Sequence, residues 1–333
     1  MNGWKSVLMA DPVEWLLGED NPSVRYFTLR DILERPAGDA ELAKAKDDIM
    51  QTGTVPKILA KMDTDEYRET YKRFYRDKYK GLVWQLIILA EHGASRTEFA
   101  QNICEYILSN SQEKEDGGFA YDASAKLGGG LKSCVIPCLT GNMVFSLIRF
   151  GYLDDERVQK AIGWIAKNQL FDDGDGSSKG KPYDRHEICF GKHTCHMGAV
   201  KALKALSGIP AEKRSGDVVL KIEEGVAYIL KHHIFKKSHD LSQVSKPGWL
   251  KLGFPLMYQD DILEILEILL QFGIKNRRMQ EAVDVVISKQ DDEGKWKLEN
   301  TFNGRFLTNI EQKGRQSKWI TLKALRVLKQ WYN

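Results

Sequence analysis

The sequence predicts an all-α fold, an α6/α6 toroid in which six inner helices each have an outer partner around a central cavity. The main observation is an apolar segment that recurs six times, aligned at Phe27, Val83, Gly141, Gly198, Leu263 and Ile320. The spacings between these positions are 56, 58, 57, 65 and 57 residues, and self-similarity at a near-constant period is typical of repeat architectures. Apolar residues at helical spacing on more than one side indicate helices buried between an outer layer and a centre.

Glycines mark the ends of the inner segments. Gly93, Gly151 and Gly273 each end one segment, and Ser207-Gly208 ends a fourth. Glycine terminates helices because it adopts the left-handed conformation without a steric penalty. These positions indicate that the apolar segments are separate helices.

One toroid domain is expected over residues 1–333, because the repeats run through the whole chain. Residues 1–36 match the other repeats least, and residues 11–36 could equally form a HEAT-like hairpin. Residues 50–79 are rich in Lys, Asp, Arg and Tyr, so we expect a loop or lid there over one mouth of the toroid.

Outer helices are expected between the inner ones, over Phe99–Ser109, Val158–Asn168 and Met279–Lys289. Each is followed by a glutamine and a glycine-containing turn, in the stretches Gln112–Phe119, Gln169–Gly176 and Gln290–Trp296. This pattern resembles the QW motif of terpene cyclases, in which the glutamine can bind the backbone of the next repeat. Together with the six repeats, it makes nearly the whole chain resemble the terpenoid cyclase and protein prenyltransferase superfamily.

Composition excludes some classes of function. The 49 basic and 46 acidic residues are well mixed and leave a net charge of +3, which gives no support for nucleic-acid binding. No apolar run approaches the ~20 residues that span a bilayer. The first residues lack the apolar core of a signal peptide, so we expect a cytoplasmic protein. In that compartment, five cysteines favour metal binding or catalysis over disulfides.

Cysteine and histidine cluster before two inner segments. The candidate metal ligands are Cys134, Cys138, His193, Cys195 and His196. Cys138, Cys195 and Asp260 each lie three residues before an aligned position, so three successive inner helices would bring them to one mouth. Zinc prefers four such ligands, and the sequence predicts a zinc site there. The alternatives are a structural zinc and free cysteines that are simply buried.

Two further resemblances support zinc but select different ligands. His193-Thr-Cys195 is similar to the segment of protein prenyltransferase β subunits whose histidine binds catalytic zinc, and Cys134 is similar to their zinc cysteine. Lys132 stands where those subunits have an aspartate. Cys195-His196-Met-Gly198 instead resembles the Cys-His-Gly of lanthionine-cyclase-like toroids, which also bind zinc.

Asp260 and Asp261 are the candidate catalytic residues. They open the fifth inner helix, where carboxylates near a metal would suit proton transfer. The alternative is helix capping, because carboxylates are favoured at a helix N-terminus.

Three functions follow from these observations. The first is a zinc-dependent enzyme with a central apolar cavity for an apolar or isoprenoid substrate, either prenyltransferase-like or a thiol-activating transferase. The second is a metal-free isoprenoid cyclase-like enzyme, although the DxDD acid of squalene-type cyclases is absent from the sequence. The third is a non-enzymatic toroid that binds a ligand or a partner, with or without a structural zinc.

Overall fold

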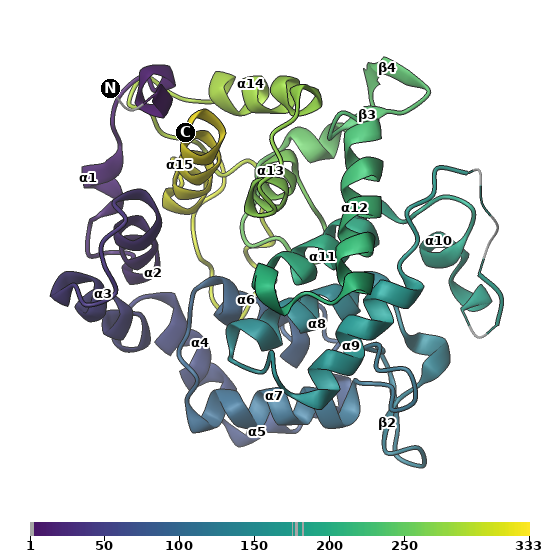
Figure 1. Ribbon diagram of the computed structural model, residues 1–333. Coiled ribbons are helices and arrows are strands. Elements are labelled where there is room, and N and C mark those ends of the chain that lie inside the picture. Colours follow the sequence, from purple (N-terminus) through teal and green to yellow (C-terminus); the bar gives the residue numbers. More distant parts are fainter. Residues whose placement is uncertain (1–2, 175, 177–178, 182) are drawn as a thin grey trace.

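A computed structural model describes residues 3–174, 176, 179–181 and 183–333. The predicted all-α toroid is confirmed: helices form an inner and an outer layer of a ring (Figure 1). The inner helices are α2 (Pro22–Phe27) with the π-helix Thr28–Ile32, α6 (Leu82–Glu91), α8 (Pro137–Arg149), α11 (His196–Ser207), α13 (Ile262–Gln271) and α15 (Lys318–Tyr332). The outer helices are α3 (Ala40–Gln51), α7 (Glu98–Asn110), α9 (Glu156–Asn168), α12 (Gly216–Lys231) and α14 (Gln280–Ser288).

Helix ends form where the sequence supplies caps. The side chains of Thr97, Asp155 and Ser215 accept backbone N–H groups at the starts of α7, α9 and α12. These bonds satisfy donors that have no partner inside the helix. After α6 and α13, Gly93 and Gly273 have φ of 69° and 76°, the left-handed conformation expected at a helix end.

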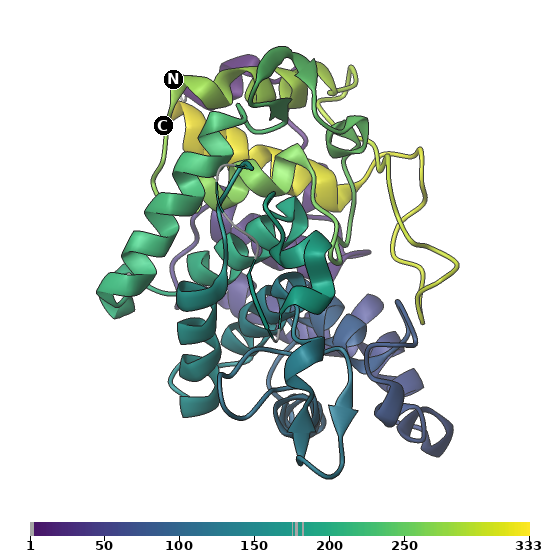
Figure 2. The same cartoon turned by 90° about the vertical axis from the view of Figure 1, so that its right-hand side faces the viewer.

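The N-terminal segment closes the ring beside α15. Its 3₁₀ turn Gly3–Val7 packs on α15, and Figure 2 shows the two termini side by side. The side chain of Gln290 donates to Val7 O (3.0 Å) and accepts from Met9 N (3.1 Å). Gln112 likewise donates to Arg157 O (2.7 Å) at the start of α9. These bonds join the outer helices α7 and α14 to the next segment of the ring, whereas Gln169 after α9 donates to the adjacent Leu170 O.

The helices α8 and α11 approach each other closely through two glycines. A Cβ added to Gly141 would lie 2.4 Å from the carbonyl carbon and oxygen of Lys201, and one added to Gly198 would lie 3.0 Å from Pro137 Cβ. Only glycine allows this separation of the two backbones. The contact brings the N-termini of α8 and α11 together, and with them the cysteines at those positions.

Residues 50–79 differ from the loop that we expected. They contain α4 (Thr54–Met62), α5 (Asp65–Arg68) and a 3₁₀ turn at Tyr71–Arg73. The apolar side chains of Val55, Ile58 and Met62 share one face of α4 and are buried. The polar composition of the segment concealed this narrow apolar stripe, which is enough to fold a helix onto the core.

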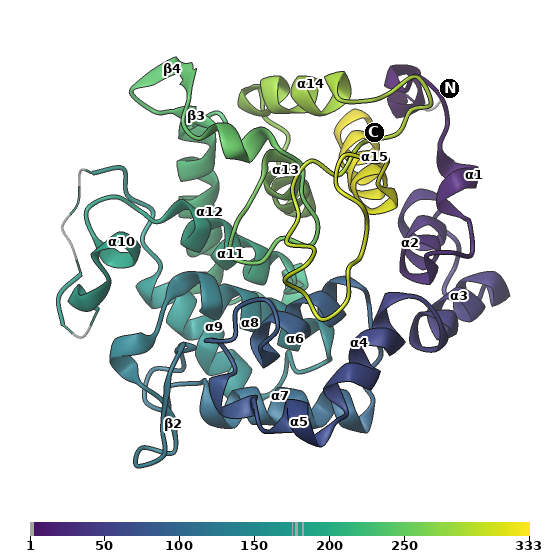
Figure 3. The same ribbon diagram turned by 180° about the vertical axis from the view of Figure 1, so that it is seen from behind.

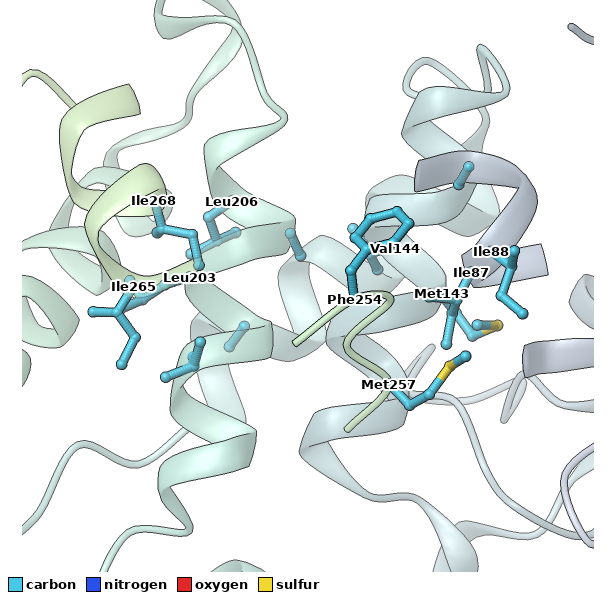
Figure 4. Close-up of a cluster of buried hydrophobic side chains, with 14 of the residues drawn as sticks. Ile87, Ile88, Met143, Val144, Leu203, Leu206, Phe254, Met257, Ile265 and Ile268 are labelled. Carbon is cyan, nitrogen blue, oxygen red and sulfur yellow. The ribbon is translucent and has the colours of Figure 1, made fainter. Parts of the chain in front are cut away.

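The apolar centre of the ring is occupied by residues 252–258, which we call the central loop. Phe254 stacks on Trp319 at 4.1 Å between ring centroids, and Asn142 Nδ2 donates to Met257 O (3.0 Å). Figure 4 shows Phe254 and Met257 reaching toward Met143 and Val144 of α8. The expected apolar cavity is therefore replaced at this level by the chain's own side chains, which gain the dispersion contacts that an empty apolar space would lose.

Short elements complete the chain. Two antiparallel pairs of strands, β1 (Ala123–Ser124) with β2 (Gly129–Gly130) and β3 (Lys236–Lys237) with β4 (Asp240–Val244), form hairpins outside the ring, and α1 (Val13–Leu16) and α10 (Glu187–Phe190) are single turns. The connection from α14 to α15 passes over one face of the ring (Figure 3). Within the described ranges, every helix falls short of the length or the apolarity needed to cross a membrane.

Candidate active site at the N-terminal mouth

Three cysteines gather where α8 and α11 begin. Cys138 is the second residue of α8, after Pro137 at a position where proline is favoured because its missing N–H is not needed. Cys195 is the N-cap of α11. Cys189 lies in the single turn α10, which precedes α11 in the chain. All three are half-buried free thiols.

The three thiols interact electrostatically. A hydrogen bond from the Cys189 thiol lowers the pKa of Cys195, and the backbone amide of Gly198 adds to the effect. The same hydrogen bond raises the pKa of Cys189. Burial, followed by the charge on Cys195, raises the pKa of Cys138 to about 12. The group therefore favours one thiolate, on Cys195, with two thiols beside it.

His196 is held by a carboxylate and an indole ring. Its Nδ1 lies 2.9 Å from Asp260 Oδ2, and its ring stacks on Trp249 with 3.8 Å between centroids. A carboxylate can only accept, so Nδ1 carries the proton and the lone pair of the neutral ring is on Nε2. That Nε2 is buried and has no hydrogen-bond partner among the described residues. A buried lone pair of this kind is available to a metal ion or to a proton of a substrate.

A pocket of about 500 Å³ opens beside these groups. Cys195 and His196 line it, together with the apolar side chains of Ile188, Met197 and Trp249. The cations Lys192 and Lys246 also line it. The pocket can therefore hold a largely apolar group against the Cys195 sulfur.

Three of the predicted site residues lie apart from this group. Cys134 is buried in the 3₁₀ turn before α8, and in the described parts of the chain no interaction joins it to the other thiols. His193 lines the same pocket, but it is exposed and its ring lies against Gly174. Asp261 caps α13: its Oδ1 accepts from Glu264 N (2.9 Å) and its Oδ2 from Gly253 N (2.8 Å).

The donor chemistry of the group fits zinc. Thiolates and an imidazole nitrogen whose other nitrogen binds a carboxylate are the groups that zinc sites use. Cys138, Cys189, Cys195 and His196 Nε2 supply four such donors. Among the described residues, however, no three His, Cys, Asp or Glu side chains already surround a common metal position. Side-chain rotations would be needed to form the site.

Sequence reasoning undervalued two residues here. Cys189 had no partner in the repeat alignment, and its only indication was its place six residues before Cys195. Trp249 lies in the long connection between the fourth and fifth repeats, in the 3₁₀ turn Pro247–Leu250. A tryptophan directly after proline-glycine was the available indication that this connection packs on the site.

Similar proteins are found among solved structures. No protein-family model and no curated protein matches the chain. One similar solved structure is a variant of the type II terpene cyclase MstE from Scytonema in complex with geranylgeranyl dihydroxybenzoate, with 14% identity and a TM-score of 0.43 over 94% of this chain and 87% of that one. A second variant of that cyclase has 16% identity and a TM-score of 0.36 over 96% and 98% of the two chains. A possible GH105 family member from Salmonella enterica serovar Paratyphi A has 12% identity and a TM-score of 0.42 over 94% and 82%.

Proposed function

We propose that the chain is a zinc-dependent group-transfer enzyme whose reaction takes place in the pocket at the N-terminal mouth. The observation that carries the proposal is a group of three interacting thiols next in the chain to His196, whose buried Nε2 has no hydrogen-bond partner among the described residues. Cys138, Cys189, Cys195 and His196 are the residues that would hold the metal. This set retains three of the ligands predicted from the sequence and replaces Cys134 and His193 by Cys189.

The remaining residues of the site have supporting roles. Asp260 fixes the tautomer and the orientation of His196, because its carboxylate accepts from Nδ1. Trp249 stacks on a face of that ring and helps to hold its orientation. Zinc held by three of these four side chains would leave one position for the thiol of a substrate, and it would keep that thiol ionised at neutral pH and so make it the nucleophile.

The apolar walls of the pocket support an apolar electrophile as substrate. In thioether formation, a thiolate attacks the allylic carbon of an isoprenyl diphosphate. A carbon–sulfur bond forms, the carbon–oxygen bond breaks with its electron pair, and diphosphate leaves. Lys192 and Lys246, which line the pocket, would attract the leaving diphosphate.

A second candidate is metal-free catalysis with Cys195 as nucleophile. The observation that favours it is the hydrogen bond from Cys189, which stabilises the Cys195 thiolate without a metal. His196, oriented by Asp260, would then act as a general base through Nε2.

Metal content separates the two candidates. Plasma mass spectrometry on protein purified without chelators should find about one zinc per chain in wild type, and much less in Cys138→Ala, Cys189→Ala and Cys195→Ala. Cys104→Ala is the matched control, because Cys104 is a buried cysteine of the outer helix α7. Wild-type protein without zinc would refute the zinc proposal.

The reaction itself is tested with the zinc-loaded protein. Incubation with geranylgeranyl diphosphate and a small thiol should give the thioether, detected by mass spectrometry, and Cys195→Ala should not form it. Zinc binding without any thioether from isoprenyl donors of several lengths would leave a structural metal site and reject the transferase.

A further inference from the structure

A second and larger cavity lies at the opposite mouth, where the inner helices end. Its volume is about 970 Å³. Its lining is charged, with seven cationic side chains and five acidic ones. The cationic residues are Arg30, Lys46, Arg149, Lys204, Lys323, Arg326 and Lys329, and the acidic ones are Asp31, Glu34, Glu91, Glu264 and Glu267.

Every acidic side chain of this cavity is already paired with a cation of the chain. Asp31 Oδ1 lies 2.5 Å from Arg30 Nε, and Asp31 Oδ2 lies 2.6 Å from Arg326. The other four acidic groups pair in the same way: Glu34 with Lys329, Glu91 with Lys204, Glu264 with Lys201 and Lys204, and Glu267 with Lys323 and Arg326. These five carboxylates therefore form ion pairs with one another's neighbouring cations, a set that we call the ion-pair network.

Arg149 and Lys46 are the cations that this network leaves over. Among the described residues, no carboxylate lies within ion-pair distance of either one. The Arg149 guanidinium instead lies over the rings of Phe27 and Phe145, at 5.9 Å and 6.0 Å. Lys46 Nζ donates to the carbonyl of Gly93 (2.5 Å) and keeps two further protons for other acceptors.

The surroundings of these cations are unfavourable for positive charge. Burial, and then the nearby charge of Arg30, lower the pKa of Arg149 although Glu91 and Asp31 oppose the shift. Burial, Arg149 and Arg30 lower the pKa of Lys46 in the same way. The Arg149 side chain is still solvent-exposed and Lys46 is half-buried, so these unpaired cations, which their cationic neighbours repel, are open to an anion that enters the cavity.

We propose that this cavity binds a small organic anion, a carboxylate or a phosphate ester, whose charged group pairs with Arg149 and Lys46. The planar guanidinium suits either anion, because both accept two parallel N–H bonds. Tyr26 and Phe145 line the same cavity and would contact the rest of the ligand. The site is separate from the zinc proposal, since none of its residues belongs to the pocket at the N-terminal mouth.

Isothermal titration calorimetry and thermal unfolding with two probes, citrate and inorganic phosphate, test this inference. Both are compared with chloride at equal ionic strength, so that general screening is subtracted. We expect at least one probe to bind wild type and raise its Tm, and about tenfold weaker binding or worse in Arg149→Met. Arg149→Lys keeps the positive charge but lacks the two parallel N–H donors of the guanidinium, so it should bind the probe more tightly than Arg149→Met and more weakly than wild type. Citrate alone binding would identify a carboxylate site, and phosphate alone a phosphate site.

The stability of the ligand-free variant adds an independent readout. Methionine removes an unpaired charge that Arg30 and Arg326 repel, so Arg149→Met without probe should be at least as stable as wild type. Arg277→Met, at an exposed arginine in the 3₁₀ turn Arg277–Met279, is the control and should bind both probes like wild type. The inference would be overturned if neither probe bound wild type, or if Arg149→Met bound the probes as well as wild type does. It would also be overturned if Arg149→Met without probe were much less stable than wild type while Arg277→Met was not.

Discussion

Gly141→Ala tests whether the contact of α8 with α11 depends on the missing side chain. The new Cβ would lie 2.4 Å from the Lys201 carbonyl carbon and oxygen and 2.8 Å from Ala202 N, whereas ordinary contact begins at 3.4 Å. These are backbone atoms of a buried helix, so they cannot rotate away. The two helices would have to separate by about 1 Å, a change of the size expected from overpacking.

The expected magnitude is a difference between two effects. Overpacking a core costs up to about 3 kcal/mol, while alanine is favoured over glycine in a helix by about 1 kcal/mol. We therefore expect Gly141→Ala to lower the free energy of unfolding by about 2 kcal/mol. The separation should also pull Cys138 away from Cys195 and weaken zinc binding.

Urea unfolding followed by circular dichroism measures the effect. Gly163→Ala is the matched control, because Gly163 lies inside α9 with nothing within 4 Å of a new Cβ. It should gain about 0.5–1 kcal/mol from helix propensity and leave zinc binding unchanged. If Gly141→Ala were as stable as Gly163→Ala, the close contact of α8 and α11 would be refuted.

Three further predictions concern buried charges. Burial raises the pKa of Asp261 to about 7, so the folded chain binds the carboxyl proton of Asp261 more tightly than the unfolded chain does. The stability that this difference contributes is complete below about pH 4 and is lost as the pH rises through 7. In urea unfolding, the stability of wild type relative to Asp261→Asn should fall by up to about 4 kcal/mol between about pH 4 and pH 8, and a difference that is flat with pH would contradict this. Asp260→Asn should weaken zinc binding about 10–100-fold in chelator competition, and unchanged affinity would reject the orienting role of Asp260. Asp240→Asn, in strand β4 outside the ring, is the control. Lys201→Met removes one of the two cations bound to the buried Glu264 and should lower the free energy of unfolding by about 3 kcal/mol. Adding Glu264→Gln to this variant should restore part of the loss, because it removes the carboxylate that is left without Lys201. A double variant less stable than Lys201→Met would show that the broken ion pair is not the cause.

Part of the candidate site could be predicted from the repeats. Alignment placed Cys138, Cys195 and Asp260 at one position of successive inner helices, and in the structure Cys138 interacts with Cys195 while Asp260 binds His196. The same alignment did not place Cys189 or Trp249 at the site, because both lie in connections between the aligned segments. It also could not decide that Asp261, beside Asp260, turns both carboxylate oxygens toward backbone amides.

The sequence by itself determined the fold class, since six apolar segments at nearly equal spacing require six buried helices and Gly93 and Gly273 end two of them. Only the tertiary structure decided where open space remains. The central loop, with no helical or strand periodicity to announce it, occupies the apolar centre with Phe254 and Met257. Periodicity reports which side of a helix is buried, but the volume left between helices depends on how loops far apart in the chain pack together. For that reason the apolar cavity was expected at the centre, and the cavities described here lie at the two mouths.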